Sequence, residues 1–149
     1  MDGYMEDYVV GSVHEYGSIR VTEEEVVDFA RRYDPHYFHI DKERAETSPF
    51  GGLIASGWHT AALMMRLLVD NFISAKASLG SPGVDKLRWV KPVRPGDDLS
   101  IRVTVHGTRR SRSKPGIGFI EFSVEVLNQR RETVMTMDTV GMGLCREKV

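Results

Sequence analysis

The sequence predicts an α+β domain in which a curved antiparallel sheet wraps around one long central helix. Two observations support this fold class. A long apolar stretch lies near the middle of the chain, and at least four segments with alternating apolar residues follow it. Strands that succeed a helix, instead of alternating with helices, favour an antiparallel sheet packed on that helix. We expect residues 1–149 to form a single domain, because no linker, repeat or low-complexity stretch divides them.

The N-terminal part predicts one or two short strands followed by a helix. Residues 9–21 mix β-branched and aromatic side chains with glycines, a composition typical of strands that meet at a turn. Thr22 and Glu25 have the spacing of a capping box, and apolar residues then recur on one helical face. We therefore expect a first helix over roughly residues 23–33.

Proline determines where that helix ends. Pro35 disfavours helical backbone at Asp34, so the helix is expected to stop there and the chain to run extended through Phe38. Residues 41–47 could form a short surface helix, and the Ser-Pro-Phe-Gly-Gly run at 48–52 predicts a turn.

The second half predicts the core helix and most of the sheet. Residues 55–74 are apolar on nearly every face, which indicates a helix covered on most sides by other structure. Alternating apolar residues separated by proline, glycine and asparagine turns then predict strands. The predicted strands are residues 84–90, 98–108, 118–128 and 133–144.

Composition excludes several functional classes. The formal charge of −1 provides no global field for nucleic acid or an anionic membrane. Cys145 is the only cysteine, so an intrachain disulfide is impossible and a reducing environment is the simplest expectation. The N-terminus lacks the pattern of a secretory signal, and polar residues interrupt the apolar stretch. We expect a soluble, cytoplasmic protein with neither nucleic acid nor membrane as a partner.

The densest polar cluster is Asp34-Pro35-His36-Tyr37-Phe38-His39. A bend could bring Asp34 and His39 to a common point such as a bound water, which is the requirement for acid/base catalysis. Burial and the negative end of the helix dipole would both favour a protonated Asp34. The structural alternative is that Asp34 merely ends a helix and His39 is an ordinary hydrogen-bonded imidazole.

This segment resembles the active-site motif of the MaoC-like dehydratases, the (R)-specific enoyl-CoA hydratase group. That motif has Asp, any residue, Asn or Gln, Pro, an apolar residue and His. Asp34, Phe38 and His39 match it, whereas His36 replaces the amide and Tyr37 replaces the proline. Two further stretches are similar to family sequences in the same order. They are Phe-Gly-Gly-Leu-Ile-Ala-Ser-Gly-Trp-His-Thr at 50–60 and Lys-Leu-Arg-Trp-Val-Lys-Pro-Val-Arg-Pro-Gly-Asp at 86–97.

The resemblance implies a hot-dog fold, a homodimer or higher homo-oligomer, and hydration of an enoyl thioester or dehydration of its 3-hydroxyacyl form. It implies that Asp34 and His39 hold one water while the backbone N–H of Gly57 binds the thioester oxygen. Phe50 and Trp58 are candidates for lining the acyl pocket. The substrate would be a thioester of coenzyme A or of acyl carrier protein, with no further cofactor.

Other polar residues are less specific. Arg109, Arg110, Arg112 and Lys114 form a basic cluster suited to the phosphates of coenzyme A, although solvated loop charge is an alternative. No metal is expected, because the histidines lack an established ligand spacing and water addition needs none. The same fold also hosts thioesterases, and the departures at positions 36 and 37 leave open a non-catalytic acyl-CoA-binding module.

Overall fold

In the computed structural model, which describes residues 3–146, five strands form one antiparallel sheet in the order β1-β3-β4-β5-β2. β3 and β4 pair from Ser100 with Leu127 to Arg110 with Gly118. The strands are β1 (Val13–Arg20), β2 (Val84–Trp89), β3 (Asp98–Arg110), β4 (Ile117–Leu127) and β5 (Thr133–Leu144). The predicted strand segments are confirmed to within a few residues.

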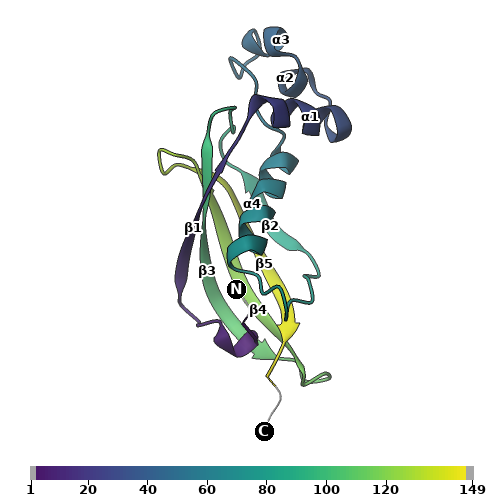
Figure 1. Ribbon diagram of the computed structural model, residues 1–149, viewed down its shortest axis with the longest axis vertical. Coiled ribbons are helices and arrows are strands. Elements are labelled where there is room, and N and C mark those ends of the chain that lie inside the picture. Colours follow the sequence, from purple (N-terminus) through teal and green to yellow (C-terminus); the bar gives the residue numbers. More distant parts are fainter. Residues whose placement is uncertain (1–2, 147–149) are drawn as a thin grey trace.

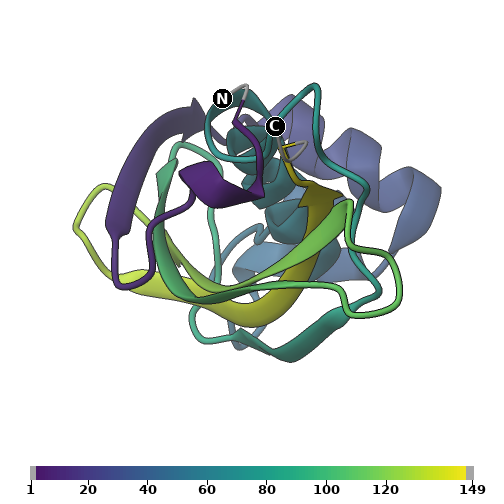
Figure 2. The same ribbon diagram turned by 90° about the horizontal axis from the view of Figure 1, so that it is seen from below.

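The sheet curves around the helix α4 (Gly57–Asn71), as Figures 1 and 2 show from two directions. Alternate residues of β3 and β4 point inward and are buried, as the period of two predicts. Leu68 of α4 and Phe72 just beyond it are almost fully buried against this concave face, and the ring of Phe72 lies 5.1 Å from that of Phe122. The predicted fold class, a helix rolled inside an antiparallel sheet, is confirmed.

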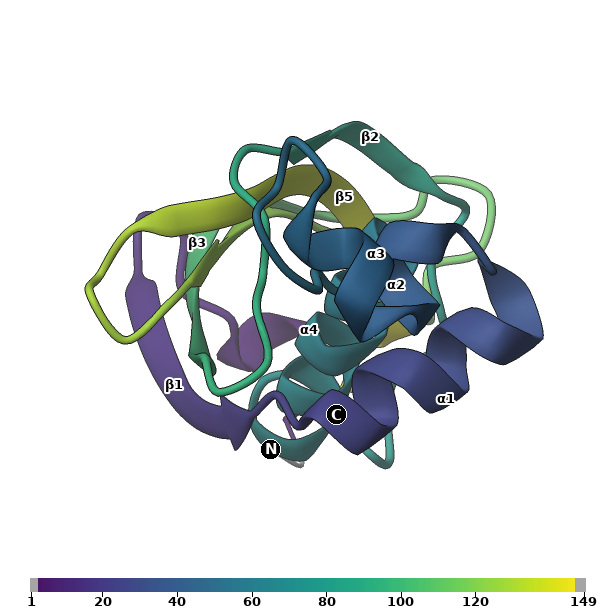
Figure 3. The same cartoon turned by 90° about the horizontal axis from the view of Figure 1, so that it is seen from above.

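Three short helices gather around the N-terminal end of α4 (Figure 3). They are α1 (Glu23–Tyr33), α2 (Tyr37–Ile40) and α3 (Lys42–Glu46), and a 3-10 turn, η1 (Met5–Asp7), lies near the N-terminus. The Thr22 side chain caps α1 by accepting from the N–H of Glu25 at 3.2 Å, which is one half of the predicted capping box, and the Asp41 side chain caps α3 by accepting from the N–H of Arg44 at 3.1 Å.

Two expectations are wrong in detail. The chain does not run extended through Phe38, because α2 begins at Tyr37 and the N–H of Asp41 donates to the carbonyl of Tyr37 at 2.8 Å. Proline restricts the residue before it and not those that follow, so a helical turn can start again at Tyr37. The central helix is also not covered on most sides, since Met65 and Val69 are 44% and 51% exposed. No helix in the described part of the chain is both long and apolar enough to span a bilayer.

Candidate active site

Asp34 lies where the chain leaves α1. Its N–H still donates to the carbonyl of Ala30 at 2.8 Å, but its backbone torsions of −155° and 69° end the helix, as Pro35 requires. The side chain is 18% exposed and points toward the start of α4, where its Oδ2 meets the hydroxyl of Ser56. The carboxylate at the C-terminal end of α1 thus lies beside the N-terminal end of α4.

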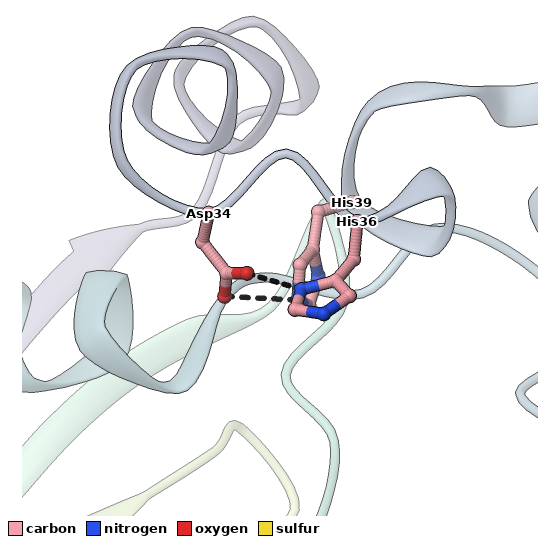
Figure 4. Close-up of side chains that lie close together, drawn as sticks. All are labelled: Asp34, His36 and His39. Atoms are coloured by element: carbon pink, nitrogen blue, oxygen red, sulfur yellow. Dashed lines mark hydrogen bonds and ion pairs between the residues drawn. The ribbon is translucent and has the colours of Figure 1, made fainter.

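His39 faces Asp34 because the short helix α2 turns the chain back. Its side chain is 6% exposed, and its Nε2 lies 3.3 Å from Oδ2 of Asp34 (Figure 4). Its other ring nitrogen, Nδ1, lies 2.6 Å from the carbonyl oxygen of Ile54. A carbonyl oxygen can only accept, so Nδ1 carries a proton and the neutral ring has its lone pair on Nε2. Nε2 is thus the ring nitrogen that faces Asp34.

The electrostatics of Asp34 differ from the sequence prediction. Burial raises the pKa of Asp34, but hydrogen bonds from Ser56 and His36 and the charge interactions with His39 and His36 lower it, and the net pKa lies below its ordinary value. The expectation of a proton-holding carboxyl group is therefore wrong. A sequence shows that a carboxyl group follows a helix, but it does not show the donors that surround it. At neutral pH Asp34 is a carboxylate that accepts hydrogen bonds.

The N-terminus of α4 forms the third part of the site. The segment that leads into it is fixed on both sides, because the N–H of Ile54 donates to the carbonyl of Phe38 and that of Ala55 to the carbonyl of Val93. Gly57 is the first residue of the helix, and the indole of Trp89 donates to its carbonyl oxygen at 2.9 Å. The first N–H groups of a helix have no intrahelical acceptor and lie at the positive end of its dipole.

These elements enclose a cavity of about 360 Å³. Asp34, His39, Phe50, Gly57 and Trp58 all line it, so the structure brings together five of the residues singled out in the sequence. Their roles in catalysis and binding remain predictions. The rest of the wall is formed by Ile54, Ala55, Thr60 and residues 89–93.

The predicted basic cluster lies elsewhere. Arg109, Arg110 and Arg112 line a separate hollow at the β3–β4 turn, at the opposite end of the molecule from α1–α3 (Figure 1). Lys114 belongs to the same turn, where its N–H donates to the hydroxyl of Ser111. Arg110 pairs with Glu6 at 2.9 Å. Within one chain the cluster does not contribute to the cavity beside Asp34, and its role in phosphate binding stays a prediction.

Two other side chains near Asp34 had little or no assigned role. His36 is 66% exposed, and its Nδ1 makes a short hydrogen bond to Oδ1 of Asp34. Asp34, His36 and His39 each offer a ligand atom within 4.8 Å of the others, a grouping that could hold a metal ion, although acid/base addition of water needs none. Ser56 was overlooked because it is 22 residues from Asp34, and no local pattern reports such a contact.

The structure is a hot-dog fold in which a carboxylate and an imidazole lie side by side near the N-terminus of the central helix. Residues 9–124 match the family model described as a MaoC like domain, and the chain belongs to this family. The family includes dehydratases and hydratases that act on acyl thioesters.

Three relatives illustrate the similarity. The structure of a MaoC-like dehydratase from Rhodospirillum rubrum superposes with a TM-score of 0.86 at 37% identity, covering 97% of this chain and 99% of that one. The uncharacterized Bacillus subtilis protein YdeM is 29% identical over 113 residues, which are 76% of this chain and 80% of that protein. The 3-hydroxyacyl-thioester dehydratase Z of Mycobacterium tuberculosis is 38% identical over 80 residues, which are 52% of this chain and 53% of that protein.

Proposed function

We propose that this protein is an (R)-specific enoyl-CoA hydratase, which in the reverse direction dehydrates 3-hydroxyacyl-CoA. The observation that carries the proposal is the separation of 3.3 Å between Nε2 of His39 and Oδ2 of Asp34 at the wall of an open cavity. Both atoms are hydrogen-bond acceptors, so one water molecule could donate a hydrogen bond to each of them. Its oxygen would then remain free to attack the substrate. Membership of a family with acyl-thioester dehydratases supports the substrate class.

The hydrogen bonds around the pair support a different role for each residue. Nδ1 of His39 is committed to the carbonyl of Ile54, so Nε2 is the atom that can take a proton from water. Asp34, which is ionised, orients the water through its second O–H and stabilises the imidazolium that forms. The hydroxyl oxygen bonds to the β-carbon as the double bond breaks, and the imidazolium then returns its proton to the α-carbon.

The start of α4 supplies the electrophilic part of the mechanism. Negative charge moves to the thioester oxygen when the β-carbon is attacked, and the backbone N–H of Gly57 would donate to that oxygen. The N-terminal end of the helix dipole favours this charge. Removal of one such donor typically costs about 10²–10³ in rate, so this contact is as important as the acid/base pair.

A second, apolar cavity along α4 is a candidate for binding the acyl chain. This cavity of about 290 Å³ is lined by apolar residues that include Met65, Leu68 and Val69 of this helix. It begins about one and a half turns beyond Thr60, which lines the first cavity, and this distance corresponds to roughly 7 Å of helix. We expect longer acyl chains to reach this second cavity, while Phe50 and Trp58 contact the part of the substrate near the thioester.

A homodimer is the expected assembly. In the described chain β2 pairs with β5 on one side, and its other edge has no strand beside it. Val84 of this strand and Val69 of α4 are 49% and 51% exposed. An unpaired edge next to an exposed apolar surface favours pairing with a second copy of the same chain.

The carrier of the acyl group is coenzyme A or acyl carrier protein, and assays with both forms of the substrate distinguish them.

The test is the loss of enoyl-thioester absorbance on addition of purified protein to enoyl-CoA. We expect hydration by the wild type and a fall of at least 10²-fold in kcat for Asp34→Asn and for His39→Gln. Release of free thiol would instead indicate a thioesterase. Tight binding of acyl-CoA without turnover would indicate a binding module, and either result would refute the proposal.

A further inference from the structure

Ser56 occupies the N-cap position of α4 without acting as a cap. It is fully buried, and its backbone torsions of −54° and 139° are those of a residue just before a helix. Serine at this position normally accepts a hydrogen bond from the N–H two or three residues on. Here no side-chain cap is formed, and the hydroxyl donates instead to Oδ2 of Asp34 at 2.7 Å.

This hydrogen bond acts on the oxygen of Asp34 that faces His39. Oδ2 receives the hydroxyl of Ser56 and lies 3.3 Å from Nε2 of His39, whereas Oδ1 receives His36. One donor on each oxygen prevents the carboxylate from rotating about its last side-chain bond. The two donors are not equivalent, because His36 is 66% exposed and competes with water, while Ser56 is fully buried.

The diverted hydroxyl also affects the helix. A capping serine would satisfy one N–H of the first turn of α4, the region that borders the cavity. Because Ser56 turns to Asp34, its side chain binds none of these N–H groups, and the N–H of His59 donates to the carbonyl of Ser56 at 3.0 Å instead. Ser56 thereby orients the carboxylate, and α4 begins without a side-chain cap.

We propose that Ser56 is a positioning residue of the active site, which holds Asp34 in the orientation needed for water addition. This inference rests on the proposed hydratase function. Ser56 contacts neither the water nor the thioester in this scheme and acts through Asp34. Its removal should therefore lower kcat with little effect on KM, since substrate contacts stay in place.

The pH profile separates a positioning role from a structural one. A hydrogen bond to the ionised carboxylate lowers its pKa, so loss of the Ser56 hydroxyl raises the pKa of Asp34 and shifts the acid limb of activity to higher pH. The other groups that face this carboxylate are His36 and His39, and both remain in the variant. Lys91 lines the same cavity but is paired with Glu132.

The experiment compares Ser56→Ala, Ser56→Thr and the control Ser123→Ala in the full chain. Ser123 lies on β4 outside the cavity, and its hydroxyl also forms a side-chain hydrogen bond, to the imidazole of His106 at 2.7 Å. With crotonyl-CoA as substrate we expect about a tenfold fall in kcat for Ser56→Ala, since a hydrogen bond to a charged group is lost. Ser56→Thr should recover most of the rate, and Ser123→Ala should match the wild type.

A second measurement separates this inference from the proposed function. The ¹³C-NMR titration of the Asp34 carboxyl carbon needs no substrate, and we expect a higher pKa in Ser56→Ala than in the wild type. Ser56→Cys, whose thiol is a weaker donor, replaces Ser56→Ala if the latter does not fold, and should shift the titration in the same direction. An unchanged titration, or a fall in rate equal in Ser56→Thr and Ser56→Ala, would overturn the role of Ser56. An inactive wild type with the expected titration shift would refute only the hydratase function.

Discussion

Gly57→Ala is a sensitive test of how closely α4 approaches the strand β2. A Cβ atom at this position would lie 2.5 Å from Nε1 and 2.7 Å from Cδ2 of Trp89. Both distances are far below van der Waals contact, and the atoms belong to a rigid ring, so the indole has to move. The movement would also break the hydrogen bond from Nε1 to the Gly57 carbonyl, now 2.9 Å long.

The magnitude follows from three terms. Overpacking costs about 1–3 kcal/mol, and the lost hydrogen bond about 1 kcal/mol. Alanine gains up to roughly 1 kcal/mol over glycine in a helix, which offsets part of this. Trp89 is 46% exposed and can shift toward solvent, which reduces the cost of overpacking. We therefore expect a net destabilisation of about 1–2 kcal/mol. Trp89 lines the cavity, so KM should rise as well.

The assay is urea denaturation of Gly57→Ala in the wild type and in a Trp89→Ala background, combined with hydration kinetics. Removing the indole removes the obstacle, so Gly57→Ala should then be neutral or slightly stabilising. Equal effects in the two backgrounds would refute the steric explanation. Wild-type stability and KM in the single variant Gly57→Ala would refute it directly.

Four further changes test other parts of the structure. His59 is buried, burial lowers its pKa, and its Nδ1 has no hydrogen-bond partner in the described chain. The wild type should therefore lose stability as pH falls below about 6.5, because His59 is protonated more readily in the unfolded chain. In urea titrations, the free energy of unfolding of His59→Leu should differ less between about pH 7.5 and 5.5 than that of the wild type. Hydrogen bonds from Lys91, Arg130 and Asn128 lower the pKa of Glu132 to about 2. Glu132→Gln should therefore be less stable than the wild type at neutral pH, and the difference should vanish as pH falls from about 4.5 toward 2. Met65→Trp narrows the apolar cavity and should reduce kcat/KM for long but not for short enoyl-CoA chains. Val69→Asp places a charge on the exposed face of α4 and should shift the assembly toward monomer in analytical ultracentrifugation.

Local patterns predicted most of the fold. The alternation of Leu99, Ile101 and Val103 identified β3, and all three residues are fully buried. Pro35 correctly predicted the end of α1 at Tyr33. These features depend on residues close in sequence. The short helix at Tyr37 was missed because its single turn has too few residues to establish a period.

The site was predicted as a set of residues but not as a geometry. Asp34 and His39 were found from spacing and family resemblance, and the contact between them depends on the turn at α2. The charge state of Asp34 depends on Ser56, which only tertiary structure brings close. The exposed face of α4 was also not predicted, because an apolar residue in a sequence does not indicate whether the same chain covers it.

The most direct test of the central claim is the hydration rate of the double variant Asp34→Asn/His39→Gln beside the two single variants. If both residues act on one water, loss of either removes the same function, and the double variant should be about as slow as the slower single variant. Multiplicative effects of the two substitutions, or a wild-type rate in either single variant, would contradict the account.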